Sequence, residues 1–448
     1  MPSPDRFMKF HFITLGCPKN RVDSEVMFGS LLQHEYEYTD DPAQAELIVV
    51  NSCSFIESAK TESINTILEM ASYKQEGSLK KLVVSGCLAQ RYQKEVEAQF
   101  PEVDHFIGTG EYYKIASILE SQQRGNYSIP SYIHTYSAPR LNSMPFYTAY
   151  LKLTEGCNRQ CGFCIIPKIR GRQKSQTIEN LAEEARRLVS NGVTELNLIG
   201  QDLTSYGTDL NDSASNLLNL LKELVKIKDL KWIRLLYCYP DKISEEFLEF
   251  LASQEKVCNY IDLPLQHIDP IILKSMKRGV TQKLILKTLD RIRSKVPNLT
   301  LRTSFIVGYP GETDLQFQTL YNFVKDQKFD HVGVFTYSHE ENTYSYDLKS
   351  QIKESVKIQR KDKLMMLQAE IAKEKKKAFV GKDLEVLIEG WDPKVGRIRA
   401  RYEGQAPDID GNVFIEEAKE NPSFQPGKYV SIRILRSLTY DLIGKVVH

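Results

Sequence analysis

Three cysteines in one short segment carry the clearest chemistry in this chain. Cys157, Cys161 and Cys164 follow an apolar segment with the spacing C-x3-C-x2-C. Three thiolates can bind three irons of a [4Fe–4S] cluster and leave the fourth iron open, whereas such clusters normally take four cysteine ligands. The spacing therefore predicts a cluster with one iron free to bind another molecule. A zinc site is the alternative, but structural zinc is usually closed by four ligands.

Three more cysteines each follow a short apolar segment that is predicted to be a strand. The segments and their cysteines are 9–15 with Cys17, 47–51 with Cys53, and 82–85 with Cys87. Helical patterns separate the segments, and strands that alternate with helices predict a parallel sheet. Ligands gather at the carboxyl ends of the strands in such sheets. We therefore expect these thiols at one sheet edge as ligands of a second cluster, again with one iron open. The alternative is three small buried side chains.

The central part of the chain repeats a strand–helix unit. The predicted strands are 147–153, 195–199, 232–237, 260–263, 299–307 and 331–336. With the C-x3-C-x2-C loop after its first strand, this part resembles the partial (β/α)6 barrel of the radical S-adenosylmethionine (SAM) enzymes. The resemblance implies that the open iron binds the amino and carboxylate groups of SAM.

Polar residues at the strand ends of such a barrel should face the active site. Gln201 and Gln266 are therefore predicted to bind SAM or substrate, with ordinary loop polarity as the alternative. Gly308 and Gly311 permit close approach of a ligand to the backbone. They resemble the SAM-adenine segment of the radical-SAM enzymes, although the same turn can serve only to shape a loop.

Three other residues near strand ends are predicted to be structural. His267 could transfer a proton, but a hydrogen-bonded structural role is the expectation. Cys238 and Cys258 each stand alone among strand residues and are expected in the core.

The last part of the chain predicts a helix followed by a small antiparallel β-barrel. The helix spans 351–380, with Gly381 as its C-cap and a solvated lysine run. The predicted strands are 383–388, 395–402, 411–415, 428–435 and 441–447. This part resembles the TRAM domain, an RNA-associated module. This part lacks the excess of basic residues expected of a domain that binds tRNA phosphates. Ribosomal RNA is a possible further partner.

Composition fits an ordinary α/β multidomain protein of 448 residues with a net charge of +1. No apolar run reaches the roughly 20 residues that span a bilayer, and the first residues lack the apolar core of a signal peptide. Eight cysteines without a secretion signal indicate metal or redox use in a reducing compartment. We therefore expect a cytoplasmic protein without membrane contact. The predicted domains are 8–124, 143–375 and 378–448.

The amino-terminal cysteine segments resemble those of one branch of the radical-SAM enzymes, the methylthiotransferases. They read Leu15-Gly16-Cys17-Pro18-Lys19-Asn20, Asn51-Ser52-Cys53 and Ser85-Gly86-Cys87. The resemblance covers essentially the whole chain and implies two [4Fe–4S] clusters and two SAM molecules per turnover. One SAM yields a radical that takes hydrogen from an unactivated C–H bond, and the other supplies a methyl group. The open iron of the amino-terminal cluster would hold the sulfur, and an electron donor and a sulfur donor are needed.

Within this family, five segments resemble the branch that modifies a protein. They are 15–25, Cys164-Ile165-Ile166-Pro167, Pro264-Leu265-Gln266-His267, 334–338 and 407–411. This branch methylthiolates the β-carbon of an aspartate in small-subunit ribosomal protein S-twelve. One departure is Asn342, where the branch usually has glycine. The alternatives are a tRNA adenosine methylthiotransferase and, in another class, a non-catalytic iron–sulfur electron carrier or redox sensor.

Overall fold

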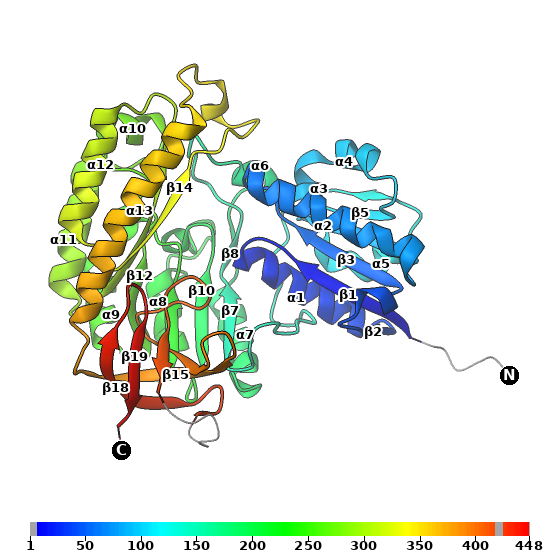
Figure 1. The fold of residues 1–448 in the computed structure, drawn as a ribbon. Helices are drawn as coiled ribbons and strands as arrows, with labels where there is room; N and C mark the ends of the chain where they lie inside the picture. The colour runs from blue at the N-terminus through cyan, green and yellow to red at the C-terminus, as the bar shows by residue number, and fades with distance from the viewer. Residues whose placement is uncertain (1–6, 417–423, 448) are drawn as a thin grey trace.

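The computed structural model describes residues 7–416 and 424–447, which form three packed parts (Figure 1). The first part is a six-stranded parallel sheet in the order β2-β1-β3-β4-β5-β6. Its strands are β1 (Met8–Thr14), β2 (Tyr36–Tyr38), β3 (Leu47–Ser52), β4 (Lys81–Gly86), β5 (His105–Ile107) and β6 (Gly125–Asn126). Its helices are α1 (Pro18–Leu32), α2 (Glu57–Glu76), α3 (Cys87–Tyr92), α4 (Lys94–Gln99) and α5 (Ile115–Glu120).

Helices cover both faces of this sheet, and successive side chains of a strand point to opposite faces. Ile48 and Val50 of β3 pack with α2, α3 and α4, whereas Leu47 and Val49 pack with α1 and α5. Both faces of each central strand are therefore buried, as expected of a parallel sheet. The predicted strands before the three cysteines are confirmed. β2, β5 and β6 were not predicted, since runs of two or three residues give no clear periodicity.

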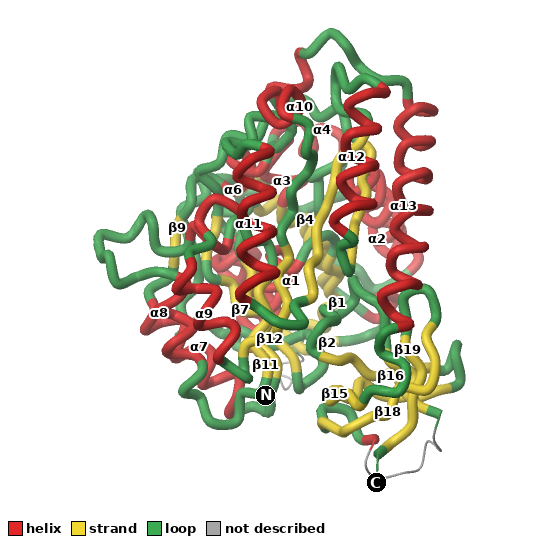
Figure 2. The backbone as a smooth tube through the Cα atoms, turned by 90° about the vertical axis from the view of Figure 1, so that its left-hand side faces the viewer, coloured by secondary structure: helices red, strands yellow, loops and turns green. Residues whose placement is uncertain are grey.

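The second part is an open barrel of six parallel strands in the order β14-β13-β12-β11-β10-β7, as predicted. The strands are β7 (Thr148–Lys152), β10 (Glu195–Ile199), β11 (Trp232–Leu235), β12 (Val257–Asp262), β13 (Thr300–Val307) and β14 (His331–Thr336), and a small ribbon joins β8 (Thr154–Glu155) to β9 (Lys174–Ser175). The helices are α6 (Ile166–Arg170), α7 (Ile178–Ser190), α8 (Leu217–Leu224), α9 (Glu245–Ser253), α10 (Pro270–Ser275), α11 (Gln282–Lys295), α12 (Asp314–Gln327) and α13 (Glu354–Lys377). Figures 1 and 2 show α12 and α13 side by side on the outside of the barrel.

The third part is a closed five-stranded barrel in the order β15-β16-β17-β19-β18. Its strands are β15 (Asp383–Asp392), β16 (Arg397–Tyr402), β17 (Val413–Ile415), β18 (Tyr429–Ser437) and β19 (Leu442–Val446). The predicted small barrel is confirmed, with one addition: β17 and β19 pair in parallel while the other pairs are antiparallel.

The helix before this barrel departs from its prediction in two details. It runs only from Glu354 to Lys377, with Ala378 as C-cap, and Gly381 lies beyond it and donates its N–H to the Ile434 carbonyl of β18. The lysine run is not wholly solvated, because Lys376 is buried and donates to the Tyr402 hydroxyl at 3.1 Å. The end of the helix packs against the small barrel, so this lysine is buried although the run of lysines predicts an exposed segment.

The loop between β16 and β17 closes the amino end of the central barrel. The Gly404 carbonyl lies 3.0 Å from Nε2 of His331, the first residue of β14. The Tyr260 hydroxyl donates to Asp410 at 2.8 Å. The opposite end, where the strands terminate, is left for the functional site. Within the described residues, no helix is both long and apolar enough to cross a membrane.

Candidate functional site

The first cysteine triad lies at the carboxyl edge of three neighbouring strands. Cys53 and Cys87 directly follow β3 and β4, and Cys17 lies three residues beyond the end of β1; the three strands are adjacent in the sheet. Gly16 has φ +85°, and a Cβ there would lie 2.8 Å from the Cys53 Sγ. Gly86 has φ +94°, and a Cβ there would lie 2.6 Å from the carbonyl oxygen of the last residue of β3, directly before Cys53. Two glycines thus let the three cysteine loops pack closely.

One side chain clamps two of these loops. The Asn20 amide donates to the carbonyls of Leu15, Asn51 and Ser52 at 2.7, 3.3 and 3.3 Å. The Asn51 amide in turn donates to the Asn20 carbonyl at 2.8 Å and to Ser24. This reciprocal pair explains why asparagines stand in two of the three cysteine segments.

The second triad lies in the loop between β8 and α6, and N–H donors point at two of its sulfurs. The Arg159 backbone N–H donates to the Cys157 Sγ at 3.4 Å, and Arg278 Nη1 donates to the Cys161 Sγ at 3.3 Å. The loop is held by a bond from the Cys164 N–H to the Cys161 carbonyl. Donors aimed at sulfur suit thiolates, which are the form that binds metal.

Burial sets the acidity of most of these thiols. It raises the pKa of Cys87 and of Cys164 to about 12, and it also raises the pKa of Cys53 and Cys157. Arg170 opposes this rise at Cys87, and neighbouring cysteines of each triad add to it. Such thiols hold their protons at neutral pH, so a metal must displace protons to bind.

The first triad contacts the segment that follows the second triad. Arg170, the last residue of α6, donates from Nη2 to the Cys87 Sγ at 3.6 Å. Ile165, directly after Cys164, and Ile169 pack against Cys87 in one buried cluster. Both triads therefore lie at the same junction between the amino-terminal sheet and the barrel mouth.

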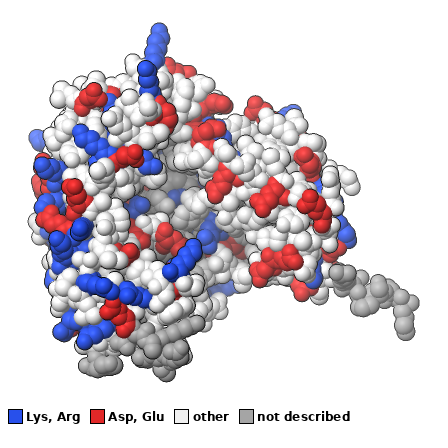
Figure 3. Space-filling view, viewed as in Figure 1, with Lys and Arg blue, Asp and Glu red and all other residues white. Residues whose placement is uncertain are grey.

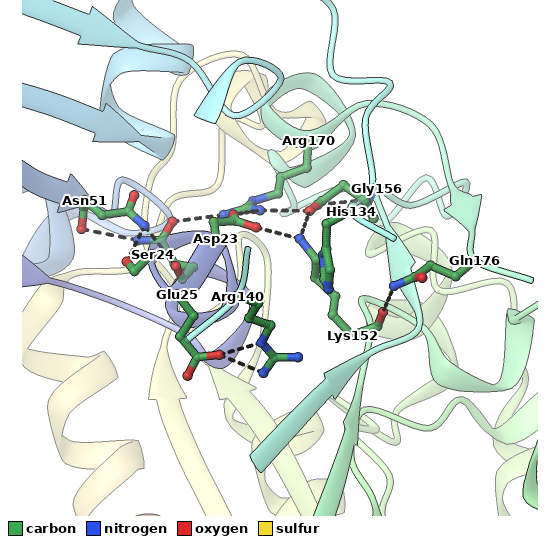
Figure 4. Close-up of polar contacts among 12 residues, drawn as sticks. Asp23, Ser24, Glu25, Asn51, His134, Arg140, Lys152, Gly156, Arg170 and Gln176 are labelled. Carbon is green, nitrogen blue, oxygen red and sulfur yellow. Dashed lines mark hydrogen bonds and ion pairs between the residues drawn. The ribbon is translucent and has the colours of Figure 1, made fainter. Parts of the chain in front are cut away.

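A buried ion network joins the two parts at this junction (Figure 4). Lys152 of β7 binds Asp23 of α1 at 2.5 Å and Glu155 at 2.9 Å. Arg170 binds the same carboxylates at 2.6 and 3.0 Å. Burial opposes ionisation of Glu155, but Arg170 and Lys152 prevail and lower its pKa to about 2.

A second network lies beside the first and includes the linker between the two parts. Arg140 of the linker binds Glu25 of α1 at 2.7 Å and also pairs with Glu184 of α7, and Figure 4 shows it next to α1. His134 lies 3.0 Å from Glu184. Burial opposes ionisation of Glu184, yet His134 and Arg140 lower its pKa to about 2. Two independent charge networks thus fix α1 against the β7 edge of the barrel.

The amino-terminal part also contacts the other edge of the barrel. Arg91 of α3 binds Glu340, in the loop after β14, at 2.8 Å. The backbone N–H of Glu57 donates to the Ser338 hydroxyl at 3.3 Å in the same loop. Since β7 and β14 are the two edge strands, the amino-terminal sheet spans the opening of the barrel.

Between these contacts the barrel interior is partly open. Val334 of β14 packs outward against the helices, whereas its neighbour Phe335, on the opposite face, is 51% exposed. Arg302 and Ile306 of β13 are likewise partly exposed among buried neighbours. The surface in Figure 3 is hollowed between the amino-terminal part and the barrel.

The glutamines that sequence predicted as ligand-binding lie at this end of the barrel. Gln201 donates to Glu155 at 3.1 Å, and its Oε1 is buried without a partner among the described residues. Gln266 has φ +72° and bridges β13 through its backbone. His267 is fully buried: its Nδ1 accepts from the Asp269 N–H at 3.0 Å, and its Nε2 lies 3.6 Å from Glu312. A structural role for this histidine agrees with these contacts.

The two glycines differ in their surroundings. A Cβ at Gly308 would lie 2.3 Å from the Lys357 side chain, so α13 covers that side of the backbone. At Gly311 the nearest atom, the Ser350 Cβ, would be 4.0 Å away, and this backbone remains open to a ligand. Cys238 and Cys258 are buried in apolar clusters of the barrel, as expected of core residues.

Sequence reasoning missed the charged residues at the junction of the parts, which are Lys19, Asp23, Lys152, Glu155 and Arg170, and it missed Arg278, which contacts Cys161 within the barrel. One signal was present: Lys152 stands in an otherwise apolar parallel strand, and lysine is almost never fully buried unless it is paired. The contacts between the parts give no spacing signal, because the partners lie far apart in the chain.

The donor set fits iron–sulfur clusters better than a single ion. Within the described residues, no three His, Cys, Asp or Glu side chains converge closely enough to hold one metal ion. A cluster instead takes each thiolate on a different iron. Each triad offers three thiols, at least one guanidinium donor directed at sulfur and no fourth cysteine. The residues of each triad would therefore fit a cluster with one open iron.

Comparison with known families divides the chain in the same way as the structure. Residues 9–108 match an uncharacterized protein family, UPF0004, residues 151–324 match the Radical SAM superfamily, and residues 380–447 match the TRAM domain. In fold, 73% of the chain superposes on 72% of the radical SAM methyltransferase TsrM from Kitasatospora setae, with a TM-score of 0.56 and 15% identity. That likeness shows the fold alone.

Curated relatives match almost the entire chain. Proteins named ribosomal protein uS12 methylthiotransferase RimO are 46% identical in Anaeromyxobacter sp. (97% of this chain, 92% of the relative), 47% identical in Myxococcus xanthus (98% and 91%), and 45% identical in Geobacter sulfurreducens (98% and 98%). Identity at this level over whole chains makes the protein an enzyme, and the electron-carrier alternative is set aside. The chain belongs to the RimO family of radical-SAM methylthiotransferases.

Proposed function

We propose that this enzyme adds a methylthio group to the β-carbon of an aspartate in ribosomal protein uS12, the decoding-centre protein called S-twelve above. The observation that carries the proposal is the match of 97–98% of the chain to relatives named for uS12. The five segments that resemble the protein-modifying branch support the same substrate. A ribosomal-protein substrate would place the reaction in the cytoplasm.

Two [4Fe–4S] clusters and SAM are the cofactors of this proposal. Cys157, Cys161 and Cys164 would hold the cluster that binds SAM, and Cys17, Cys53 and Cys87 would hold the other. When bound, a reduced cluster and SAM supply the radical chemistry that an unactivated C–H bond requires, which no side chain offers. An external electron donor and a sulfur donor complete the reaction. The proposed domains are 8–124, 143–375 and 378–448.

The chain's own residues bring the two sites together and shield them. Arg170 and Ile165 place Cys87 against the loop of the second triad. Contacts of α1 with β7, and of Arg91 with the loop after β14, close both sides of the mouth. Such closure keeps water away from reactive species. Gln201 and Gln266, with Gly311, are proposed to contact SAM or substrate in this enclosure, and Gly308 to shape the turn that holds Gly311.

The test is an anaerobic assay of the reconstituted full chain. The protein receives SAM, sulfide and dithionite together with a peptide that spans the target loop of uS12 and, in parallel, unmodified tRNA. Mass spectrometry then looks for the mass gain of a methylthio group on either substrate. Modification of the peptide at aspartate supports the proposal. Modification of tRNA alone would overturn the choice of substrate and leave the methylthiotransferase chemistry standing.

A further inference from the structure

A buried cation without a carboxylate partner lies beside each cysteine triad. Lys19 stands two residues after Cys17 in α1 and is 8% exposed, and Arg278 follows α10 and is 6% exposed. Among the described residues, no carboxylate forms an ion pair with either cation. Lysine and arginine are almost never fully buried unless their charge is paired. The groups that these two side chains do contact therefore show which charge they balance.

Lys19 faces the first triad and a tyrosine of the barrel. Its ammonium interacts with the Cys17 thiol and with the Tyr237 hydroxyl, and its Nζ lies 3.4 Å from the centroid of the Tyr237 ring. Cys17 is also the N-cap of α1, so its thiol lies at the positive end of that helix. The ammonium and the helix thus both place positive charge beside this sulfur.

Arg278 faces the second triad in a similar way. Its Nη1 donates to the Cys161 Sγ at 3.3 Å, and its Nη2 donates to the Pro264 carbonyl at 2.6 Å. Its guanidinium carbon lies 4.4 Å from the Tyr239 ring centroid, and its Nε is buried without a hydrogen-bond partner among the described residues. Of the groups that it contacts, only the sulfur can carry a full negative charge, as a thiolate.

Other cations near the triads are balanced by carboxylates. Arg170 also contacts the Cys87 sulfur, yet it pairs with two carboxylates. Arg159 lies 3.7 Å from the same Tyr239 ring as Arg278, and it pairs with two others. Each triad is therefore left with one buried cation, Lys19 or Arg278, that faces the triad and has no carboxylate.

We propose that Lys19 and Arg278 each balance the negative charge of one [4Fe–4S] cluster, Lys19 at the first triad and Arg278 at the second. The inference rests on the two clusters of the proposed function. Three thiolates outweigh the positive charge of an oxidised [4Fe–4S] core by one, and an added electron makes the cluster more negative. One buried cation at each triad matches this net charge. Because the cation favours the more negative state, it raises the reduction potential of the cluster beside it.

The test is an EPR-monitored redox titration of the reconstituted full chain. Full chains in which one triad is replaced by alanine assign each potential to its triad. At a fixed potential, Lys19→Met should lower the ratio of reduced to oxidised first cluster about tenfold, which is about 59 mV for one electron. Arg278→Met should do the same to the second cluster. Lys19→Arg and Arg278→Lys keep the charge and should retain most of the wild-type potential.

Lys277→Met is the matched control for the loss of a lysine or arginine charge. Lys277 precedes Arg278 in the chain and lies 3.5 Å from the Tyr344 ring centroid, but it is exposed. Water and salt screen an exposed charge, so this substitution should leave both potentials unchanged. A shift in Lys277→Met as large as in Arg278→Met would contradict a specific role of the buried guanidinium.

Iron analysis of each protein separates the possible results. Wild type with iron for only one cluster would overturn the two clusters of the proposed function. Two clusters whose potentials are unchanged in Lys19→Met and Arg278→Met would overturn only the role of the two cations. If a methionine variant loses the iron of its own triad, the charge-conserving variant decides. Iron kept in that variant supports the proposal, whereas iron lost there too shows that the shape of the side chain matters and overturns it.

Discussion

Glu195 and Arg401 form a bidentate ion pair that joins the central barrel to the TRAM barrel. Arg401 donates to the two carboxylate oxygens at 3.1 and 2.8 Å, and both side chains are buried. Arg234 adds a third contact at 3.1 Å. Glu195 is the first residue of β10, so this pair lies at the barrel end opposite the cysteines. It fixes the TRAM barrel at the amino end of the central barrel.

Glu195→Gln should destabilise the protein and weaken docking of the TRAM barrel. The substitution leaves Arg401 and Arg234 buried without their carboxylate, which costs about 3–5 kcal/mol of unfolding free energy. Urea denaturation of the metal-free protein measures this loss. Glu183→Gln is the control, since Glu183 pairs with Arg186 on the surface and should change stability by about 1 kcal/mol or less. Equal effects of both substitutions would contradict the assigned role of the buried pair.

The same pair predicts a pH dependence. Burial opposes ionisation of Glu195, but Arg401 and Arg234 lower its pKa from 4.5 to about 2. The carboxylate therefore stabilises the fold above about pH 4.5, and this contribution is lost as the pH falls toward about 2. Since glutamine resembles the protonated acid, the difference in stability between wild type and Glu195→Gln should narrow below about pH 4.5. A difference that stays constant between neutral and acid pH would disprove the shift.

Arg170 should tune the cluster of the amino-terminal triad. Arg170→Met removes a positive hydrogen-bond donor from the Cys87 sulfur, and loss of such a donor favours the oxidised, less negative cluster. We expect a lower midpoint potential in an EPR-monitored redox titration, with partial recovery in Arg170→Lys. Arg186→Met, a substitution on the exposed face of α7, is the control. An unchanged potential in Arg170→Met would show that the contact is only structural.

The cysteines give the most direct test of the two-cluster proposal. Replacing Cys17, Cys53 and Cys87 together by alanine should leave about half of the iron of wild type, and so should replacing the other triad. Cys238→Ala and Cys258→Ala should keep the full iron content, because both thiols are buried in apolar clusters away from the triads. Iron and sulfide analysis after anaerobic reconstitution measures each. A triple variant that keeps all of its iron would exclude that triad as a ligand set.

The sequence could predict strands and helices that repeat or that follow a hydrophobic period. It could not predict contacts between residues of different domains. Strands β1, β3 and β4 were found because each is an apolar run that ends at a cysteine. The contact between Arg170 and Cys87 leaves no such signal in the sequence, because 83 residues separate the two in the chain. Lys19 was quoted only as part of a motif, since its contact with Tyr237 of the central barrel is a property of the folded molecule. The prediction of a solvated lysine run in α13 was wrong at Lys376, because the TRAM barrel covers that side chain.

At Gly29 of α1 we predict that alanine destabilises the protein, although alanine has the higher helix propensity. This glycine lies inside α1, where alanine normally stabilises a helix by about 1 kcal/mol relative to glycine. A Cβ at Gly29, however, would lie 1.6 Å from the Pro139 carbonyl oxygen and 3.3 Å from the Arg140 nitrogen, because the linker crosses α1 here. Gly29→Ala must therefore displace the linker and, with it, the Arg140 contacts to Glu25 and Glu184.

We expect Gly29→Ala to lower the unfolding free energy despite its better propensity, by about 1–3 kcal/mol as for other overpacked sites. Ser72→Ala in the exposed face of α2 is the matched substitution, which gains propensity without a steric cost and should be neutral or slightly stabilising. Urea denaturation of the two metal-free variants shows whether each substitution raises or lowers the unfolding free energy. If Gly29→Ala stabilises the protein as Ser72→Ala does, the linker does not press on α1, and the close docking of the amino-terminal sheet on the barrel would lose one of its supports.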